Sequence, residues 1–161
     1  MSEARTALID ANLLALWIIG QVSEAEVPRC RRTRHYSIDD YRMLAKYLSR
    51  FSQVLIIPNI ATETSNLIGA LSGAYLQQAR SILAAGLRVW DECYVPSIQA
   101  INEREYRRLG LTDAAILITA SRDTEVLTDD FDLYLCLSHR GIPVTNFTHL
   151  RAQNWSKKQG K

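Results

Sequence analysis

Cysteine is scarce in this sequence. The three residues, Cys30, Cys93 and Cys136, lie far apart and are odd in number. No C-x-x-C pair and no finger-like spacing of cysteine and histidine occurs, which argues against a zinc site. The simplest interpretation is a cytoplasmic protein whose thiols are reduced.

Long hydrophobic runs are also missing. The most apolar stretch, ANLLALWIIG at residues 11–20, is shorter than the roughly 20 apolar residues that span a bilayer. Residues 1–10, MSEARTALID, do not have the layout of a signal peptide, because acidic residues flank a very short apolar run. We therefore expect a cytoplasmic protein that has no membrane partner.

Neither sign of charge predominates. The formal net charge is +2, which is too small by itself to indicate a nucleic-acid binder. The 161 residues are 47% hydrophobic and 22% charged, as expected for one globular domain. No internal repeat or linker divides the chain. We therefore place a single domain at residues 4–150, followed at residues 151–161 by a polar tail that we expect to be frayed.

Short apolar runs alternate with helical patterns along the chain. Continuous apolar runs are typical of strands that are covered on both faces, and their alternation with helices predicts a parallel sheet. We expect an α/β fold of three layers, α/β/α, around a central, mainly parallel sheet of four to five strands. The runs are TALID (6–10), VLIIP (54–58), EVLTDD (125–130) and IPVTNF (142–147), and RVWDECYVP (88–96) is either irregular or a short strand.

Helices are predicted between these strands, and several have clear start or stop signals. Ser37 is a helix cap followed by acidic residues in the first turn, and Pro58 suits the first position of a helix. The helix at residues 11–20 is expected to end near Gly20. Further helices are predicted at residues 58–71, at 74–87, at 97–110 with a stop at Gly110, at 111–121 with Thr112 as cap, and at 131–141.

Acidic residues follow the ends of the predicted strands, where an open parallel sheet binds its ligands. Asp10 ends the first strand, and Asp130 directly follows the third. Glu63 lies in the second turn of the helix after the second strand, and Asp113 lies in the first turn of the helix after Gly110. Two unit charges 4 Å apart repel by about 4 kcal/mol at an effective dielectric of 20, so such a group predicts a bound cation. Oxygen-only ligands favour Mg²⁺ or Mn²⁺.

These residues resemble the PIN-domain nucleases, the family that includes the VapC-type ribonuclease toxins. The resemblance extends from Ala7 to Phe147. It implies a PIN-like fold and a metal-dependent endoribonuclease, a hydrolase of phosphodiester bonds that uses Mg²⁺ or Mn²⁺. The segments that carry it are LIDAN (8–12), TE (62–63), GLTDAAIL (110–117), LTDDFDL (127–133) and GIPVTNF (141–147).

The resemblance implies a role for each matching residue. Asp130 is preferred to Asp129 as the last ligand, because it stands two residues after Thr128 and two before Asp132. The implied partners are an RNA substrate, a cognate antitoxin protein as in toxin–antitoxin pairs, and a second copy of the chain in a homodimer. The implied site consists of the metal-binding and catalytic quartet Asp10, Glu63, Asp113 and Asp130, the accessory acid Asp132, and the supporting residues Asn12 and Thr128.

Every candidate also has a purely structural interpretation. Asp10 and Asp130 can cap the helices that follow them, and Asp113 can serve the dipole of its helix. Asp129 is interpreted as a solvated turn residue. The basic segment at residues 28–36 is either a solvated loop or a patch that contacts RNA phosphates, with His35 and Tyr36 available to contact bases. Its arginines are Arg29, Arg31, Arg32 and Arg34.

Competing functions fit the sequence less well. A phosphatase of the haloacid-dehalogenase type needs a second aspartate two residues after the first, where this chain has Asn12. That class and the receiver domains also need a late lysine, and none stands between Lys46 and Lys157. The remaining alternative is a non-catalytic PIN scaffold that binds RNA or a protein. Such scaffolds are expected to lack one or more of the four acids, all of which have candidates here.

Overall fold

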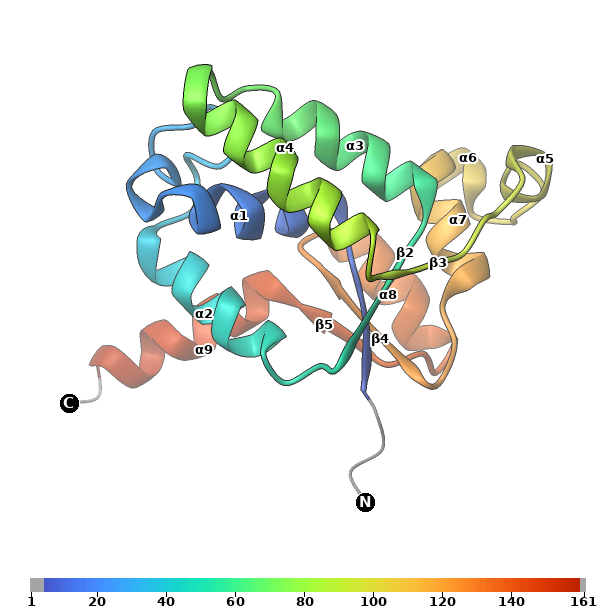
Figure 1. Ribbon diagram of the computed structural model, residues 1–161. Helices are drawn as coiled ribbons and strands as arrows, with labels where there is room; N and C mark the ends of the chain where they lie inside the picture. The colour runs from blue at the N-terminus through green and yellow to red at the C-terminus, as the bar shows by residue number, and fades with distance from the viewer. Residues whose placement is uncertain (1–4, 160–161) are drawn as a thin grey trace.

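A computed structural model describes residues 5–159 of the chain. Its centre is a five-stranded sheet in the order β3-β2-β1-β4-β5, and all of its strand pairs are parallel (Figure 1). The predicted α/β class, with three layers around a parallel sheet, is confirmed. The strands are β1 (Thr6–Ile9), β2 (Gln53–Ile56), β3 (Asp91–Glu92), β4 (Thr124–Thr128) and β5 (Val144–Asn146).

Helices cover both faces of this sheet. Helices α1 to α4 lie on the face that is turned to the viewer in Figure 1, and α8 lies behind the sheet. The helices are α1 (Ala11–Val22), α2 (Ile38–Leu48), α3 (Pro58–Ile68), α4 (Gly73–Leu87), α5 (Ser97–Ala100), α6 (Tyr106–Leu109), α7 (Leu111–Thr119), α8 (Phe131–His139) and α9 (Phe147–Gln159), with a short 3₁₀ turn η1 (Glu24–Glu26).

Strand β1 lies at the centre of the sheet, between β2 and β4. Its residues Ala7, Leu8 and Ile9 are buried, as the continuous apolar run predicts. After β1 the chain continues to β2, which pairs on one side of β1, and β4, which comes later in the chain, pairs on the other side. The connections therefore diverge at the carboxyl ends of β1 and β4, which is the place where open parallel sheets form a ligand crevice.

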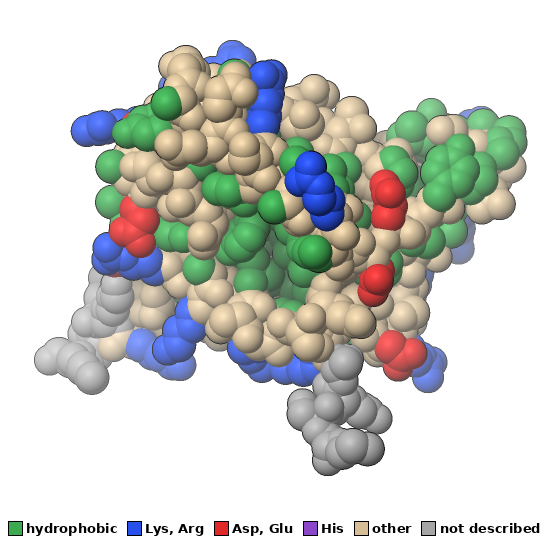
Figure 2. Space-filling model, viewed as in Figure 1, with side chains coloured by type: hydrophobic (Ala, Val, Ile, Leu, Met, Phe, Trp, Pro, Cys, Tyr) green, Lys and Arg blue, Asp and Glu red, His purple; other side chains and the backbone are tan. Residues whose placement is uncertain are grey.

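An apolar hollow opens on the face that α1, α2 and α4 cover. Figure 2 shows hydrophobic side chains gathered in it. A groove of about 280 Å³ is lined there by Trp17, Phe51 and Trp90, and it reaches Val54 of the sheet. No helix within residues 5–159 is long and apolar enough to cross a membrane.

Two helix starts follow the predicted chemistry. The Ser37 hydroxyl accepts a hydrogen bond from the Asp40 N–H at 3.1 Å, and the Asp40 carboxylate accepts one from the Ser37 N–H at 2.8 Å. These two bonds form a capping box. Pro58 stands at the first position of α3, where its missing N–H has no intrahelical partner to lose.

The single helix predicted at residues 97–110 is wrong, because the structure has α5 and α6 with turns between them. Glu103 in the break forms an ion pair with Arg140 at 2.6 Å, a tertiary contact that no local pattern encodes. The prediction that Thr112 caps the next helix is also wrong. Gly110 is the cap, with φ of 90°, and Thr112 is the second residue of α7.

Helix α1 ends at Val22, close to the end predicted near Gly20. The ring of Tyr41 in α2 packs directly over this glycine, and a Cβ placed there would lie 2.1 Å from the ring. At the other end of the chain, the predicted domain limit at residue 150 falls inside α9. The fraying of residues 151–161 remains a prediction; residues 4, 160 and 161 lie outside the described part.

We expect Ser37→Ala to lower the free energy of unfolding by about 1 kcal/mol, because the orphan N–H of Asp40 loses its acceptor. Urea unfolding measures this loss. Ser72→Ala is the matched control: Ser72 is the cap residue of α4, but its side chain makes no capping hydrogen bond. Equal losses in the two variants would contradict this account of the capping box.

Candidate functional site

Asp10 lies at the carboxyl end of β1, and the backbone fixes both of its carboxylate oxygens. One oxygen accepts a hydrogen bond from the Leu13 N–H at 3.0 Å, which caps α1, as the structural interpretation of Asp10 predicts. The other accepts from the Asp129 N–H at 3.1 Å. The Asp10 N–H in turn donates to the Leu127 carbonyl at 2.9 Å. Asp10 is thus held between the ends of β1 and β4.

Asp129 belongs to this site, contrary to its interpretation as a solvated turn residue. It is half-buried, and the hydroxyl of Tyr36 donates a hydrogen bond to its carboxylate. Tyr36 itself is buried, so the prediction that it is available to bases is wrong. Burial, followed by the negative charge of Asp129, raises the pKa of Tyr36, which keeps its hydroxyl protonated as a donor.

The electrostatics of Asp10 reflect this crowding. Burial and, second to it, the neighbouring charge of Asp129 together raise its pKa from 3.8 to about 7, against the opposing effect of hydrogen bonds from Thr128 and two backbone N–H groups. Near neutral pH the carboxyl group therefore exchanges a proton readily. A cation beside it would replace that proton and remove the repulsion.

The other three predicted acids form a second group. Burial, then the charges of Asp130 and Glu63, raises the pKa of Asp113 to about 7. Glu63 is exposed on α3, and its carboxylate accepts a hydrogen bond from the hydroxyl of Thr112, a contact that sequence reasoning missed. Asp130 caps α8 through the Leu133 N–H at 2.9 Å. Glu63 of α3, Asp113 of α7 and Asp130 at the start of α8 therefore lie close enough for their charges to interact.

The two groups are adjacent, because Asp129 and Asp130 are consecutive residues. Thr128, buried at the end of β4, accepts a hydrogen bond from the Asp130 N–H at 3.0 Å. The donors are carboxylate and hydroxyl oxygens, which fit a hard cation such as Mg²⁺ or Mn²⁺. Within residues 5–159, however, no three acidic, histidine or cysteine side chains are close enough to hold a metal ion.

Two further predicted residues lie away from these contacts. Asp132 is exposed and forms an ion pair with Arg108 at 3.3 Å, so its charge is directed to α6 and not to the other acids. Asn12 is the second residue of α1 and is exposed. The structure thus joins Asp10 to Asp129, and Asp113 to Asp130 and Glu63.

The arginine-rich loop at residues 28–36 has one buried face. Cys30, Thr33 and Tyr36, three residues apart, are buried, and the Thr33 hydroxyl donates to the Val27 carbonyl at 2.8 Å. This spacing is the signal by which the anchoring role of Tyr36 could have been found. The four arginines are exposed, and only Arg29 forms an ion pair within the described residues, with Glu26 at 3.8 Å.

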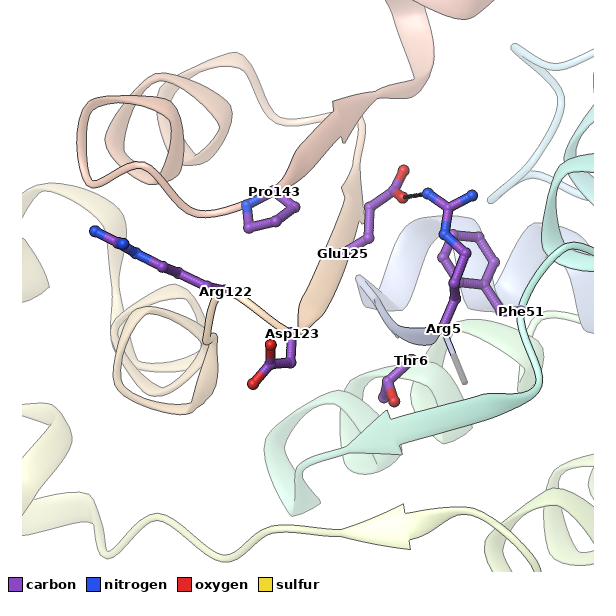
Figure 3. A pocket seen from close by; sticks show the side chains of 7 residues that line it. All are labelled: Arg5, Thr6, Phe51, Arg122, Asp123, Glu125 and Pro143. Atoms are coloured by element: carbon purple, nitrogen blue, oxygen red, sulfur yellow. Dashed lines mark hydrogen bonds and ion pairs between the residues drawn. The ribbon is translucent and has the colours of Figure 1, made fainter. Parts of the chain in front are cut away.

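A cavity of about 380 Å³ opens at the opposite edge of the sheet, where β1 and β4 begin (Figure 3). Its one acid from the sheet, Glu125, forms an ion pair with Arg5 at 2.9 Å and accepts a hydrogen bond from Thr145 at 2.7 Å. Those charges are matched within the protein. The carboxylates of Asp10 and Asp113, which neighbouring acids repel, lie at the carboxyl edge of the sheet, whereas Glu125 at the opposite edge is paired with Arg5.

No model of a known protein family matches the chain. No curated protein sequence matches it either. The resemblance to PIN-domain nucleases therefore rests on the residues themselves, and the geometry above is the basis of the functional proposal.

We expect the free energy of unfolding, measured in EDTA, to fall as the pH rises from 3.8 to about 7. In that window the native state keeps protons on Asp10 and Asp113 that the unfolded chain has released. Asp10→Asn removes one of these two contributions and keeps an oxygen that can cap α1, so the fall should be smaller. Urea unfolding across this pH range measures it.

Glu24→Gln is the control for this pH series. Arg42 lowers the pKa of Glu24, so its contribution is present above the ordinary pKa and lost as the pH falls. Its removal should not reduce the fall in stability toward pH 7. A slope in Asp10→Asn equal to that of the wild type would contradict the buried-proton account.

Proposed function

We propose that the protein is a metal-dependent endoribonuclease, which uses Mg²⁺ or Mn²⁺ at Asp10, Glu63, Asp113 and Asp130. The observation that carries this proposal is the position of the repelling carboxylates. Asp10 directly follows β1 and Asp130 comes shortly after β4, at the diverging connections of the sheet, and the pKa values of Asp10 and Asp113 are raised to about 7. The resemblance to PIN-domain nucleases supplies the reaction class.

Each of these acids is held by a hydrogen bond. Two backbone N–H groups fix Asp10, the Leu133 N–H holds Asp130, and the Thr112 hydroxyl holds Glu63. With Asp113, these carboxylates would hold the cation. A bound Mg²⁺ or Mn²⁺ activates water and stabilises charge on a phosphate. In the proposed reaction water attacks phosphorus and the P–O3′ bond breaks, so the phosphate stays on the 5′-oxygen and the leaving 3′-oxygen takes up a proton to become a hydroxyl.

An anionic substrate also fits the neighbouring arginine loop. Tyr36, which ends the loop, contacts Asp129 beside Asp10, so the loop is anchored at the site. Phosphates bound by Arg31, Arg32 and Arg34 would lead an RNA strand toward the acids. A toxin role with a cognate antitoxin, and a homodimer, are further parts of the proposal that rest on the family resemblance alone.

A second candidate function is a PIN scaffold that binds RNA or a protein without cleaving. One observation favours it: among the described residues, no three acids are close enough to hold a metal ion. This scaffold would keep the arginine loop and the fold. It would bind RNA with an affinity that is independent of Mg²⁺ and Mn²⁺.

The test is cleavage of a single-stranded RNA of mixed sequence in Mg²⁺ and in Mn²⁺. We expect Asp10→Asn, Asp113→Asn and Asp130→Asn each to lower the cleavage rate by at least about 100-fold, as the loss of a metal ligand does in catalytic sites. Asp132→Asn is the matched control, because Asp132 faces Arg108, and its rate should change little.

The product ends provide the second readout. Products with a 5′-phosphate and a 3′-hydroxyl support the proposal, whereas 2′,3′-cyclic phosphates would contradict it. RNA binding without any cleavage, unaffected by the three substitutions, would favour the scaffold function instead.

A further inference from the structure

A cluster of three aromatic rings, two exposed and one half-buried, begins at the residue that follows Asp130. Phe131 is the first residue of α8, immediately after Asp130, and its side chain is 55% exposed. Tyr134 follows one turn later, with its ring centre 6.2 Å from that of Phe131 and the two ring planes 27° apart. His149 of α9 lies across from both, at 6.2 Å from Phe131 and 5.1 Å from Tyr134.

The backbone holds these rings in place. The Asp130 carboxylate accepts a hydrogen bond from the Leu133 N–H and so fixes the first turn of α8, which carries Phe131. The Asn146 side chain accepts from the His149 N–H at 3.2 Å, and the buried Phe147 anchors the start of α9. These contacts fix the backbone from which the rings of Phe131 and His149 project.

Packing does not explain the exposure of Phe131. A large apolar side chain in water between two acidic neighbours forfeits the free energy that its burial would supply. Exposed aromatic faces beside a nuclease-like acidic site are suited to stack unpaired nucleobases, and stacking is tolerant of sequence because every base has a π-face. One adjacent charge is already compensated, since Asp132 forms its ion pair with Arg108.

We propose that Phe131, Tyr134 and His149 form a stacking platform for an unpaired base of an RNA strand whose backbone passes the acids. This inference rests on the proposed function, because RNA is the ligand it assumes. An acidic and aromatic surface also fits a basic protein segment. The exposed Arg31, Arg32 and Arg34 favour RNA, because these arginines would repel a basic partner and attract a chain of phosphates.

The test compares the affinities of wild type and Phe131→Ala for single-stranded oligoribonucleotides, with Ca²⁺ present in place of Mg²⁺. Each stacked base contributes about 1–3 kcal/mol, so we expect Phe131→Ala to weaken binding by about 5- to 150-fold. An abasic ribose–phosphate oligomer of the same length should bind both proteins equally. Tyr75→Ala, which removes a 43% exposed ring from α4, is the matched control and should bind like the wild type.

Phe131→Trp adds a direct readout of stacking. It keeps an aromatic face, so affinity should stay within about threefold of the wild type, which corresponds to less than the contribution of one stacked base. The fluorescence of the new indole should be quenched by the oligoribonucleotide beyond the quenching seen in the wild type, and not by the abasic oligomer. Thermal unfolding of each variant checks that the fold is intact.

Several outcomes would overturn the platform. It fails if Phe131→Ala binds the oligoribonucleotide as tightly as the wild type, if the abasic oligomer loses affinity equally, or if nothing binds at millimolar concentration. An oligo-arginine peptide serves as a probe for a basic partner. If Phe131→Ala binds this peptide more weakly than the wild type does but binds RNA equally well, the surface belongs to a basic protein instead. Cleavage is measured separately. If the wild type cleaves RNA and Phe131→Ala binds it normally, only the stacking platform is refuted. If Phe131 contributes to base-dependent binding but the wild type does not cleave, only the nuclease function is refuted.

Discussion

The parallel pairing of β1 with β4 is the interaction on which the candidate site depends. It aligns Ile9 with Leu127, and one more hydrogen bond, from the Asp10 N–H to the Leu127 carbonyl, extends it past the end of the strand. That register brings Asp10 to the backbone of Asp129. Like charges are thus held together by sheet hydrogen bonds and by the apolar side chains that bury both strands, and not by any attraction between them.

The helices complete what the sheet begins. Asp10 and Asp130 each cap the helix that follows, so two of the acids near the carboxyl ends of β1 and β4 also start helices. Tyr36 ties the arginine loop to this edge through Asp129. The proposed nuclease would need acids for a cation, positive charge for phosphates and flat surfaces for bases; the acids, the arginine loop and the ring of Phe131 would supply these.

Much of this arrangement follows from local patterns. Continuous apolar runs identify β1 and β4, and the rule that ligands bind at carboxyl strand ends places Asp10 and Asp130 at one edge. Tertiary contacts were beyond such patterns. Tyr36 contacts Asp129, Thr112 contacts Glu63, and Glu103 pairs with Arg140 where a continuous helix was expected. Each contact joins side chains far apart in sequence, where hydrophobic periodicity carries no information.

Thermal unfolding with and without Mn²⁺ tests the central claim, that the acids at the ends of β1 and β4 form one cation site. A cation at 100 times its dissociation constant adds about 2.7 kcal/mol of stability. We expect this gain in the wild type and in Asp123→Asn, whose substitution lies at the opposite edge of the sheet, but not in Asp10→Asn or Asp130→Asn. Equal stabilisation of all four proteins by millimolar Mn²⁺, or of none, would contradict the account.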